Sequence, residues 1–343
     1  MENAPKRDEE ARLADYLKGK IPSFRGPIKM RQFGSGRSNP TFLIEAKSGS
    51  YVLRRQPFGP LLKSAHAVDR EYRVLVALQD TPVPVPRAYH LCEDRDVIGS
   101  MFYVMSLEDG FIFPDATFKE IPRDQRDSYY CEMVRVLCCL HDLNPETIGL
   151  GSFGRPGNYF ERQVGRWTQQ YRASETETLH AMEELIAWLP LHTPADDGQS
   201  GLVHGDYHFA NIIFHSGEPR IRAVLDWELS TLGHPLADLS YFCTGLRLPE
   251  HFPIRGLAGK DRRSLGIPAE EEIVELYCRF RNMERIANWP FYIAFSFFRL
   301  AAIVQGVKKR ALIGTASNRE ESLRLGSVPG VLADMAVEII QNE

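Results

Sequence analysis

The sequence has little net charge, no long uncharged apolar run and no closely paired cysteines. Its 343 residues include 41 basic and 45 acidic side chains, a formal net charge of -4. This balance provides no long-range field that would gather nucleic acid or anionic lipid. The six cysteines form no CxxC pair, and most lie in apolar stretches. This usage favours a reduced, cytoplasmic compartment over a disulfide framework or a cysteine-based metal site.

Signals for secretion or membrane insertion are also missing. The N-terminal stretch MENAPKRDEEARLADYL alternates charges and lacks the apolar centre of a signal peptide. The most apolar segment, WPFYIAFSFF at 289–298, is followed at once by Arg299 and falls short of the roughly 18 residues that a membrane span needs. We therefore predict a buried helix there, and neither a membrane nor nucleic acid as a partner. The sequence does not choose between a monomer and a homodimer.

The first third of the chain has the pattern of a small β-rich lobe. IKMRQF (28–33), TFLIEA (41–46) and YVLRR (51–55) predict three antiparallel strands, and GSMFYVMSL (99–107) predicts another. Residues 65–78 predict an amphipathic helix with Val68, Tyr72, Leu75 and Val76 on its apolar side. The segment TPVPVPRAY that follows predicts a stiff turn.

Beyond Asp109-Gly110 the pattern changes to long helices, for example 128–140 and 271–280, the second behind Pro268. We predict an α+β fold of two lobes: a β-rich lobe with one main helix (1–105), a hinge (106–110) and a mainly helical lobe (111–343). A groove between such lobes is an ordinary place for a binding site.

Two short motifs in the second lobe carry the chemistry. HGDYHFANIIF sets Asp206 five residues before Asn211, which is the H-x-D-x-x-x-x-N spacing of a kinase catalytic loop. AVLDWE places Asp226 at the end of an apolar strand, where a carboxylate could hold metal against phosphate oxygens. The two motifs together are far more specific than either alone.

With these motifs, the chain resembles the aminoglycoside phosphotransferase and choline kinase superfamily, small-molecule relatives of protein kinases. It is most similar to the branch fused to acyl-CoA dehydrogenases in some eukaryotes. The resemblance covers most of residues 33–242 and rests on FGSGRSNPTFLI, YVLRRQPFG, AHAVDREYRVL, FYVM, ERQVGRW, VHGDYHFANIIF and VLDWELSTLGHPLADLSYF. It implies a bilobal protein-kinase-like fold, with ATP (GTP not excluded) and Mg²⁺ as cofactors. In such a fold residues 1–105 would bind the nucleotide, and residues 111–343 would carry the catalytic loop and the substrate site.

The resemblance also assigns roles in the first lobe. The turn GSGRSN would cover the phosphates, through Gly34, Ser35, Gly36 and Asn39, although the third glycine of the protein-kinase pattern is missing. Arg54 stands where relatives carry a phosphate-binding lysine, so a planar fork replaces a point charge. Glu71 would pair with Arg54, and an ordinary exposed ion pair is the alternative. Residues Ser106 to Glu108 would present backbone groups to the base.

In the second lobe the resemblance makes Asp206 the catalytic base and Asn211 and Asp226 the metal ligands. His208 lies where protein kinases carry a lysine that touches the transferring phosphoryl group. For His204 and Asp238 it implies supporting roles, bracing the catalytic loop from within the core.

The substrate class follows from what lies around these motifs. Only eleven residues separate Asp226 from Asp238, too few for a peptide-docking activation loop, so a small hydroxylated molecule is the expected acceptor. Arg162 and Arg166, four apart on a predicted helix beside Trp167, suit a carboxylate or phosphate on that molecule; a solvated helix face is the alternative. The helical lobe shows no acidic cluster like those that hold polycationic aminoglycosides. We therefore expect an anionic acceptor, and the resemblance to the branch fused to acyl-CoA dehydrogenases implies a hydroxy acid or a hydroxyacyl thioester.

Three other hypotheses are weighed against this one. His204, Asp206 and His208, with His215 or His234, could form the zinc site of a metal-dependent hydrolase. The departures at Arg54 and in the glycine turn leave room for a nucleotide-binding pseudokinase or regulatory module. An acyl-CoA dehydrogenase would need a flavin domain, for which too little chain remains.

Overall fold

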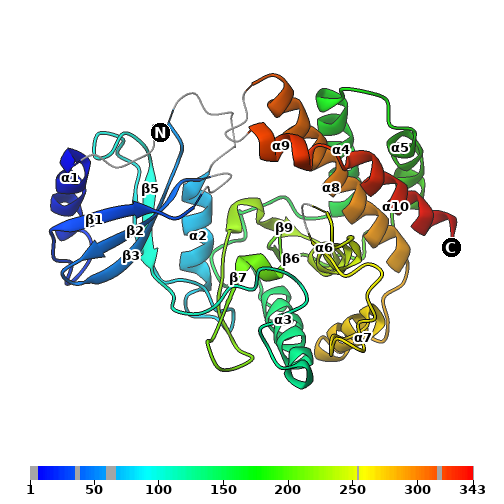
Figure 1. Cartoon of the computed structure of the whole chain (residues 1–343), viewed down its shortest axis with the longest axis horizontal. Helices are drawn as coiled ribbons and strands as arrows, with labels where there is room; N and C mark the ends of the chain where they lie inside the picture. Colours follow the sequence, from blue (N-terminus) through cyan, green and yellow to red (C-terminus); the bar gives the residue numbers. More distant parts are fainter. Residues whose placement is uncertain (1–6, 35–38, 59–66, 253–254, 315–318, 343) are drawn as a thin grey trace. The chain divides into compact units, whose positions relative to one another are not determined.

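The computed structural model of the chain describes residues 7–34, 39–58, 67–252, 255–314 and 319–342. The chain forms two compact units (Figure 1). One unit comprises Met1–Phe111 together with Ile212–Leu229, and the other comprises Ile112–Asn211 together with Ser230–Glu343. The sequence-based division at residues 106–110 assigned Phe111 and residues 212–229 to the second lobe, whereas in the structure they belong to the first unit.

The first unit contains a five-stranded antiparallel sheet in the order β1-β2-β3-β5-β4. The strands are β1 (Ile28–Gln32), β2 (Thr41–Ala46), β3 (Gly49–Arg55), β4 (Ala88–Cys92) and β5 (Phe102–Ser106). The four predicted strands are present. Strand β4 begins at Ala88, inside the segment TPVPVPRAY that the sequence indicated only as a stiff turn. The sequence did not predict this strand, because its pairing with β5 is a tertiary contact and its side chains do not alternate clearly in polarity.

Helices cover the two faces of this sheet. Side chains of successive strand residues point to opposite faces, and Phe102 and Val104 join a cluster with Leu13 and Leu17 of α1 (Arg7–Lys18). Tyr103, between them, faces α2 (Val68–Leu78). Helix α2 buries Val68, Val74, Leu75 and Leu78. The prediction that Val76 lies on its apolar side is wrong, since that side chain is 45% exposed.

A short hairpin completes the first unit. Strands β7 (Ile212–Phe214) and β8 (Ile221–Val224) pair antiparallel, with Ile212 opposite Val224. The hairpin is tied to the rest of the unit by a bridge between Phe111 and Phe214 and by a hydrogen bond from the Val224 amide to the Pro84 carbonyl. These contacts place Asp226, which follows β8, in the same unit as the sheet.

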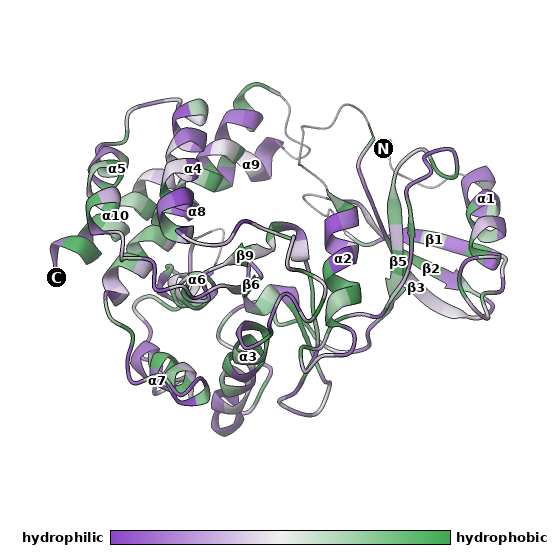
Figure 2. Ribbon diagram, turned by 180° about the vertical axis from the view of Figure 1, so that it is seen from behind, coloured by the Kyte–Doolittle hydropathy of each residue, from purple (hydrophilic) through white to green (hydrophobic). Residues whose placement is uncertain are grey.

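The second unit is mainly helical, and the predicted α+β class is confirmed. Its helices are α3 (Arg126–His141), α4 (Tyr159–Ser174), α5 (His180–His192), α6 (Leu236–Arg247), α7 (Glu270–Phe280), α8 (Trp289–Leu312), α9 (Arg319–Leu325) and α10 (Pro329–Gln341). Short segments β6 (Gly201–Val203) and β9 (Thr231–Gly233) pair antiparallel. Figure 2 shows both hydrophilic and hydrophobic residues along α3 and α10, as helices with one buried face require.

Helix α8 is the centre of this unit and packs against α4, α6, α9 and α10. By length and composition alone α8 could cross a membrane, but 78% of its most apolar stretch is buried inside the structure. Its burial agrees with the buried helix predicted from residues 289–298. The predicted helices 128–140 and 271–280 correspond to α3 and α7.

Candidate active site

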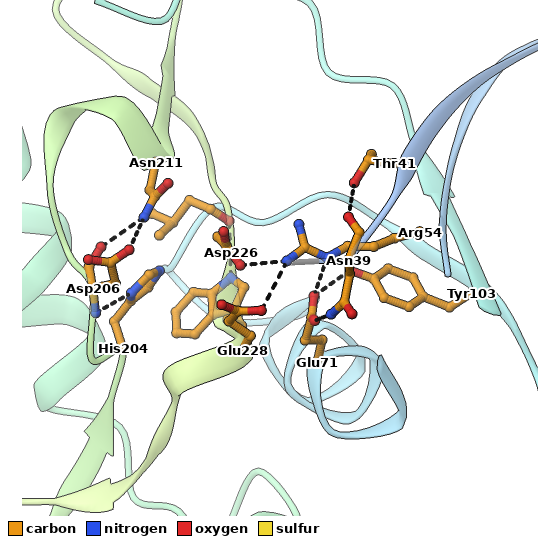
Figure 3. A network of polar contacts seen from close by, with 12 residues as sticks. Asn39, Thr41, Arg54, Glu71, Tyr103, His204, Asp206, Asn211, Asp226 and Glu228 are labelled. Atoms are coloured by element: carbon orange, nitrogen blue, oxygen red, sulfur yellow. Dashed lines mark hydrogen bonds and ion pairs between the residues drawn. The ribbon is translucent and has the colours of Figure 1, made fainter. Parts of the chain in front are cut away.

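In the first unit, Arg54 on β3 lies between carboxylates from two distant segments (Figure 3). Its Nε atom is 2.8 Å from Oε2 of Glu71 on α2, and its Nη2 atom donates a hydrogen bond of 2.6 Å to Oδ1 of Asp226. The side chains of Arg54 and Glu71 are only 13% and 1% exposed. The predicted pairing is therefore present, and an ordinary exposed ion pair is excluded.

Glu71 is the most buried carboxylate of this cluster. Its Oε1 accepts a hydrogen bond of 2.6 Å from Nδ2 of Asn39, and its Oε2 accepts one of 3.0 Å from the Tyr103 hydroxyl. Burial raises the pKa of Glu71 to about 7, and the opposing attraction of Arg54 does not cancel this effect. These four side chains hold β3, α2 and β5 in a fixed relation around the guanidinium.

This raised pKa predicts a pH-dependent contribution to stability. Because the folded state binds the Glu71 proton more tightly than the unfolded state, its contribution is complete below the ordinary pKa of 4.5 and is lost as pH rises through about 7. The difference in unfolding free energy between the wild type and Glu71→Gln should fall over this window by about 3 kcal/mol, at about 1.36 kcal/mol per pKa unit. Urea denaturation at a series of pH values measures this difference.

Glu45→Gln, on the exposed part of β2, is the matched control for loss of a carboxylate. If the difference in unfolding free energy between the wild type and Glu71→Gln stayed constant or rose as the pH increased through this window, the raised pKa of Glu71 would be contradicted.

Asp226 has the backbone signature of a functional position. Its φ of 63° lies in the left-handed region, which is sparsely populated by residues other than glycine and is often found at active sites. The indole of Trp227 donates a hydrogen bond of 3.0 Å back to the Val224 carbonyl, which secures the turn. Motif spacing pointed to Asp226, but this conformation was not predictable from the sequence.

The charges around Arg54 fit a divalent cation. Glu228, which the sequence analysis did not select, brings Oε2 to 3.7 Å from Nη2 of Arg54. One guanidinium thus faces three carboxylates (Glu71, Asp226 and Glu228), and with Glu71 ionised the cluster carries two surplus negative charges. Burial alone would lower the pKa of Arg54, but the negative charges of Glu71 and Asp226 raise it by more. The net pKa lies above the ordinary value, so the guanidinium stays charged. Carboxylate oxygens are the ligands that Mg²⁺ prefers.

The turn predicted to cover the phosphates is only partly described by the structure. Ser35 and Gly36 lie outside the described residues, and Gly34 lies just before that gap. Asn39 is 2% exposed and uses its amide nitrogen on Glu71, so its contact to a nucleotide stays a prediction.

The connector after β5 is stiffened by Ser106. The Ser106 hydroxyl accepts a 2.8 Å hydrogen bond from the Arg87 amide and donates one to the Glu108 carboxylate. These bonds fix the backbone that we expect to meet the base, whereas base binding by Ser106 and Glu108 stays a prediction.

In the second unit, the loop after β6 brings Asp206, His208 and Asn211 together (Figure 3 labels Asp206 and Asn211). Nδ2 of Asn211 donates hydrogen bonds of 3.0 Å to both the backbone oxygen and Oδ2 of Asp206. Nε2 of His208 lies 3.5 Å from the same carboxylate oxygen. Because Asn211 turns its nitrogen toward Asp206, its carbonyl oxygen is the atom suited to a metal ion.

Asp206 is ionised at neutral pH. Burial would raise its pKa, but the nearby His208 and His204 and a hydrogen bond from Tyr241 lower it below the ordinary value of 3.8. Such a carboxylate is a weak base that can still orient a hydroxyl group, which is what a dissociative phosphoryl transfer requires.

The catalytic loop is held by partners from several helices. Oδ2 and Oδ1 of Asp238 accept hydrogen bonds of 2.6 and 2.8 Å from the amides of His204 and Gly205. Nη2 of Arg299 donates a 2.5 Å bond to the Gly205 carbonyl, and Nδ1 of His204 accepts one of 3.1 Å from the Asp206 amide. The contacts of His204 and Asp238 agree with the supporting roles implied by the resemblance.

Sequence reasoning missed Arg299 and Tyr241 as residues of this loop. Arg299 is 6% exposed and stacks over the rings of Tyr241 and Trp167, with its guanidinium carbon 5.1 and 5.6 Å from their centroids. An arginine directly after a long apolar run was the available signal, because a buried charge requires polar partners.

The predicted substrate residues have local partners in the structure. Arg162 donates hydrogen bonds to the carbonyls of Arg155 (2.5 Å) and Pro156 (3.3 Å), just before α4. Arg166 is exposed and lies over Trp167, which is 7% exposed and packs against Arg299. Their contact with an acceptor stays a prediction.

A pocket of about 680 Å³ lies within the helical unit, a volume suited to a small molecule. Residues of α4, α5 and 193–196 line it, with Tyr292 and His234. The described residues of its lining include two carboxylates, Glu161 and Asp196, and neither lysine nor arginine. The sequence analysis found no such acidic grouping, because these residues come together only in the fold.

The hypothesis of a zinc hydrolase finds no support in the described part of the chain, which contains no group of three or more His, Cys, Asp or Glu side chains able to hold a metal ion. His204 already uses Nδ1 on the Asp206 amide. His234 uses its two ring nitrogens on the Leu236 amide and on Asp197.

The α+β fold and the ion-paired Arg54–Glu71 cluster define a protein of the kinase-like phosphotransferase class. The chain belongs to the phosphotransferase enzyme family (APH), whose pattern it matches over residues 29–275. The predicted superfamily and fold are therefore confirmed.

Individual relatives agree with this family. The chain is 45% identical over 333 residues to acyl-CoA dehydrogenase family member 10 of Mus musculus, covering 96% of this chain and 31% of that protein. The chain thus spans about a third of that relative, and the predicted likeness to the branch fused to acyl-CoA dehydrogenases is confirmed.

Solved structures show the same fold. A putative aminoglycoside phosphotransferase from Ralstonia eutropha is 42% identical, with a TM-score of 0.88 and coverage of 97% of this chain and 98% of that one. A thermostable mutant of aminoglycoside phosphotransferase APH(4)-Ia, solved with AMP-PNP and hygromycin B, is 14% identical with a TM-score of 0.62, covering 97% and 99%. The second likeness shows the fold alone.

Proposed function

We propose that this chain is an ATP-dependent kinase that transfers the γ-phosphate to a hydroxyl group of a small molecule, in a reducing, cytoplasmic compartment. The observation that carries the proposal is the contact of Arg54 with both Glu71 and Asp226. A permanent cation held next to a strained carboxylate is the arrangement that phosphate and metal require. The AMP-PNP complex of APH(4)-Ia supports nucleotide binding by relatives.

Each residue has a defined task in this proposal. Arg54 compensates phosphate charge, and Asp226 and Asn211 supply oxygen ligands to Mg²⁺. When bound, that ion would neutralise charge that develops on the transferring group. Asp206 orients the acceptor hydroxyl and accepts its proton, and His208 donates a hydrogen bond beside it. The hypothesis that Asn211 and Asp226 bind one ion stays a prediction.

Two kinds of acceptor are considered. Arg162 and Arg166 led to the expectation of an anionic acceptor, such as a hydroxy acid or a hydroxyacyl compound. The carboxylates of Glu161 and Asp196 in the helical pocket favour a neutral or cationic hydroxylated molecule instead. The hydrogen bonds of Arg162 to the carbonyls of Arg155 and Pro156 weaken the first alternative.

A screen of acceptors tests the proposal. ATP consumption, with GTP in parallel, is measured against hydroxylated acids, hydroxyacyl thioesters, neutral sugars and amino alcohols, with Mg²⁺ present and chelated. We expect nucleotide consumption that depends on both Mg²⁺ and one acceptor class. Nucleotide binding without turnover on any acceptor would favour the pseudokinase alternative. Metal-dependent hydrolysis of one of the screened compounds in the absence of nucleotide would favour the hydrolase.

A further inference from the structure

Asp238 of α6 is a fully buried carboxylate with three donors around it. Its oxygens accept the amides of His204 and Gly205, and its Oδ2 also lies 3.3 Å from Nε2 of His141, the last residue of α3. Asp238 and the side chain of His141 are both inaccessible to solvent. The first two contacts set the backbone directly before Asp206, so whatever fixes Asp238 also fixes the start of the catalytic loop.

The hydrogen-bond partners of His141 determine its tautomer. Its Nδ1 lies 2.7 Å from the hydroxyl of Tyr277 on α7, and that hydroxyl accepts a 2.9 Å bond from Nη1 of Arg281. A guanidinium can only donate, which leaves the Tyr277 hydrogen available to Nδ1 of His141. The ionised Asp238 carboxylate can only accept, which requires a hydrogen on Nε2. The imidazole therefore carries its proton on Nε2, where it faces Asp238, and burial lowers the pKa of His141, which keeps the ring neutral.

Arg281 connects these buried groups to the surface. Its Nε donates a 2.9 Å hydrogen bond to Oδ1 of Asp142, whose side chain is 55% exposed. The series from Arg281 through Tyr277 and His141 to Asp238 thus joins α7, α3 and α6 to the catalytic loop. Tyr277 and His141 each accept one hydrogen bond and donate another, so the geometry of one member constrains the next.

We propose that His141 and Tyr277 are positioning residues for Asp206: they form a directed hydrogen-bond relay that orients Asp238, which in turn fixes the amides of His204 and Gly205. The consequence for catalysis rests on the proposed function, whereas the relay itself can be tested without turnover.

The first test reads the tautomer directly. Nitrogen chemical shifts of ¹⁵N-labelled histidine in the full chain, assigned with His141→Gln, report which ring nitrogen is protonated. We expect His141 to be the neutral Nε2–H form at about pH 7 and above, since its pKa is lowered. Protonation on Nδ1, or a doubly protonated ring in this range, would overturn the relay.

The second test reads the catalytic loop by hydrogen exchange. In His141→Leu the amides of His204 and Gly205 should exchange at least ~10-fold faster relative to other core amides of the same variant. His141→Gln, whose amide nitrogen can replace Nε2, should restore most of the protection. Tyr277→Phe gives the same readout if His141→Leu does not fold, and Tyr171→Phe, a buried tyrosine of α4 outside the relay, is its matched control. The proposal would be refuted if Tyr277→Phe and Tyr171→Phe reduced the protection of the His204 and Gly205 amides equally. It would also be refuted if these two amides showed no selective change.

The third test uses turnover once an acceptor is known. Tyr277→Phe should lower kcat by about 10-fold with little change in the KM for nucleotide, because the relay acts on the loop and not on nucleotide binding. Loss of folding stability alone would not produce this separation. If the wild type shows no turnover on any acceptor, the proposed function fails, and the two spectroscopic tests still decide the relay.

Discussion

Replacement of Asp206 by asparagine is expected to lower turnover by about three orders of magnitude, the range for loss of a general base. Binding of Mg-nucleotide should stay within about threefold of the wild type, because Asp206 makes its contacts with Asn211 and His208 within the loop. The amide has nearly the same shape but cannot accept the proton. Steady-state ATP consumption measures turnover, and calorimetric titration with a non-hydrolysable nucleotide measures binding.

Asp334→Asn is the matched control for this change, because Asp334 is an exposed carboxylate on α10 of the same unit. Its turnover should equal that of the wild type. Unchanged turnover in Asp206→Asn would remove Asp206 from the reaction and with it the kinase assignment. Since the pKa of Asp206 is lowered, its protonation should not reduce turnover between about pH 5 and about pH 8.

The second large effect is expected from Asp226→Asn, which should weaken Mg-nucleotide binding by at least ~100-fold and abolish measurable turnover. The substitution removes a charge from the 2.6 Å pair with Arg54 and a ligand suited to the metal ion, and a 100-fold loss of binding corresponds to about 2.8 kcal/mol. Titration of nucleotide with and without Mg²⁺ separates the two contributions. Binding without metal should change far less than binding with metal.

Glu218→Gln serves as the control within the same hairpin, since Glu218 lies between β7 and β8 with its side chain 57% exposed. This variant should bind and turn over as the wild type does. If Asp226→Asn bound Mg-nucleotide normally, the carboxylate cluster around Arg54 would be structural only. Loss of binding in Asp226→Asn, with no wild-type turnover on any acceptor, would indicate a nucleotide-binding regulatory module.

Local pattern was sufficient for part of the fold. Four of the five sheet strands and the helices α2, α3, α7 and α8 follow from apolar periodicity, since that period depends on neighbouring residues alone. Strand β4 was missed, and Val76 was assigned to the wrong side of α2, because both depend on which element packs alongside. The position of residues 212–229 in the first unit depends on long-range contacts with Phe111 and Pro84.

The candidate site divides in the same way. The sequence alone revealed the spacing of Asp206 and Asn211 and the apolar strand before Asp226. Both are local features, because residues of one loop or at the end of one strand lie at fixed distances along the sequence. The burial of Glu71, the three donors on Asp238 and the stacking of Trp167 on Arg299 were not visible. Each joins residues from elements far apart in the chain, so no local period reports them.

The sequence by itself determined the fold class, the family and the residue types available for phosphoryl transfer. Only the tertiary structure decided which partners those residues have: Arg54 has the carboxylates of Glu71, Asp226 and Glu228, and Arg162 has the carbonyls of Arg155 and Pro156. It also decided that His141 contacts Asp238. The physical reason is that backbone conformation responds to near neighbours, whereas the protonation, charge and hydrogen bonding of a buried group depend on every element that packs around it.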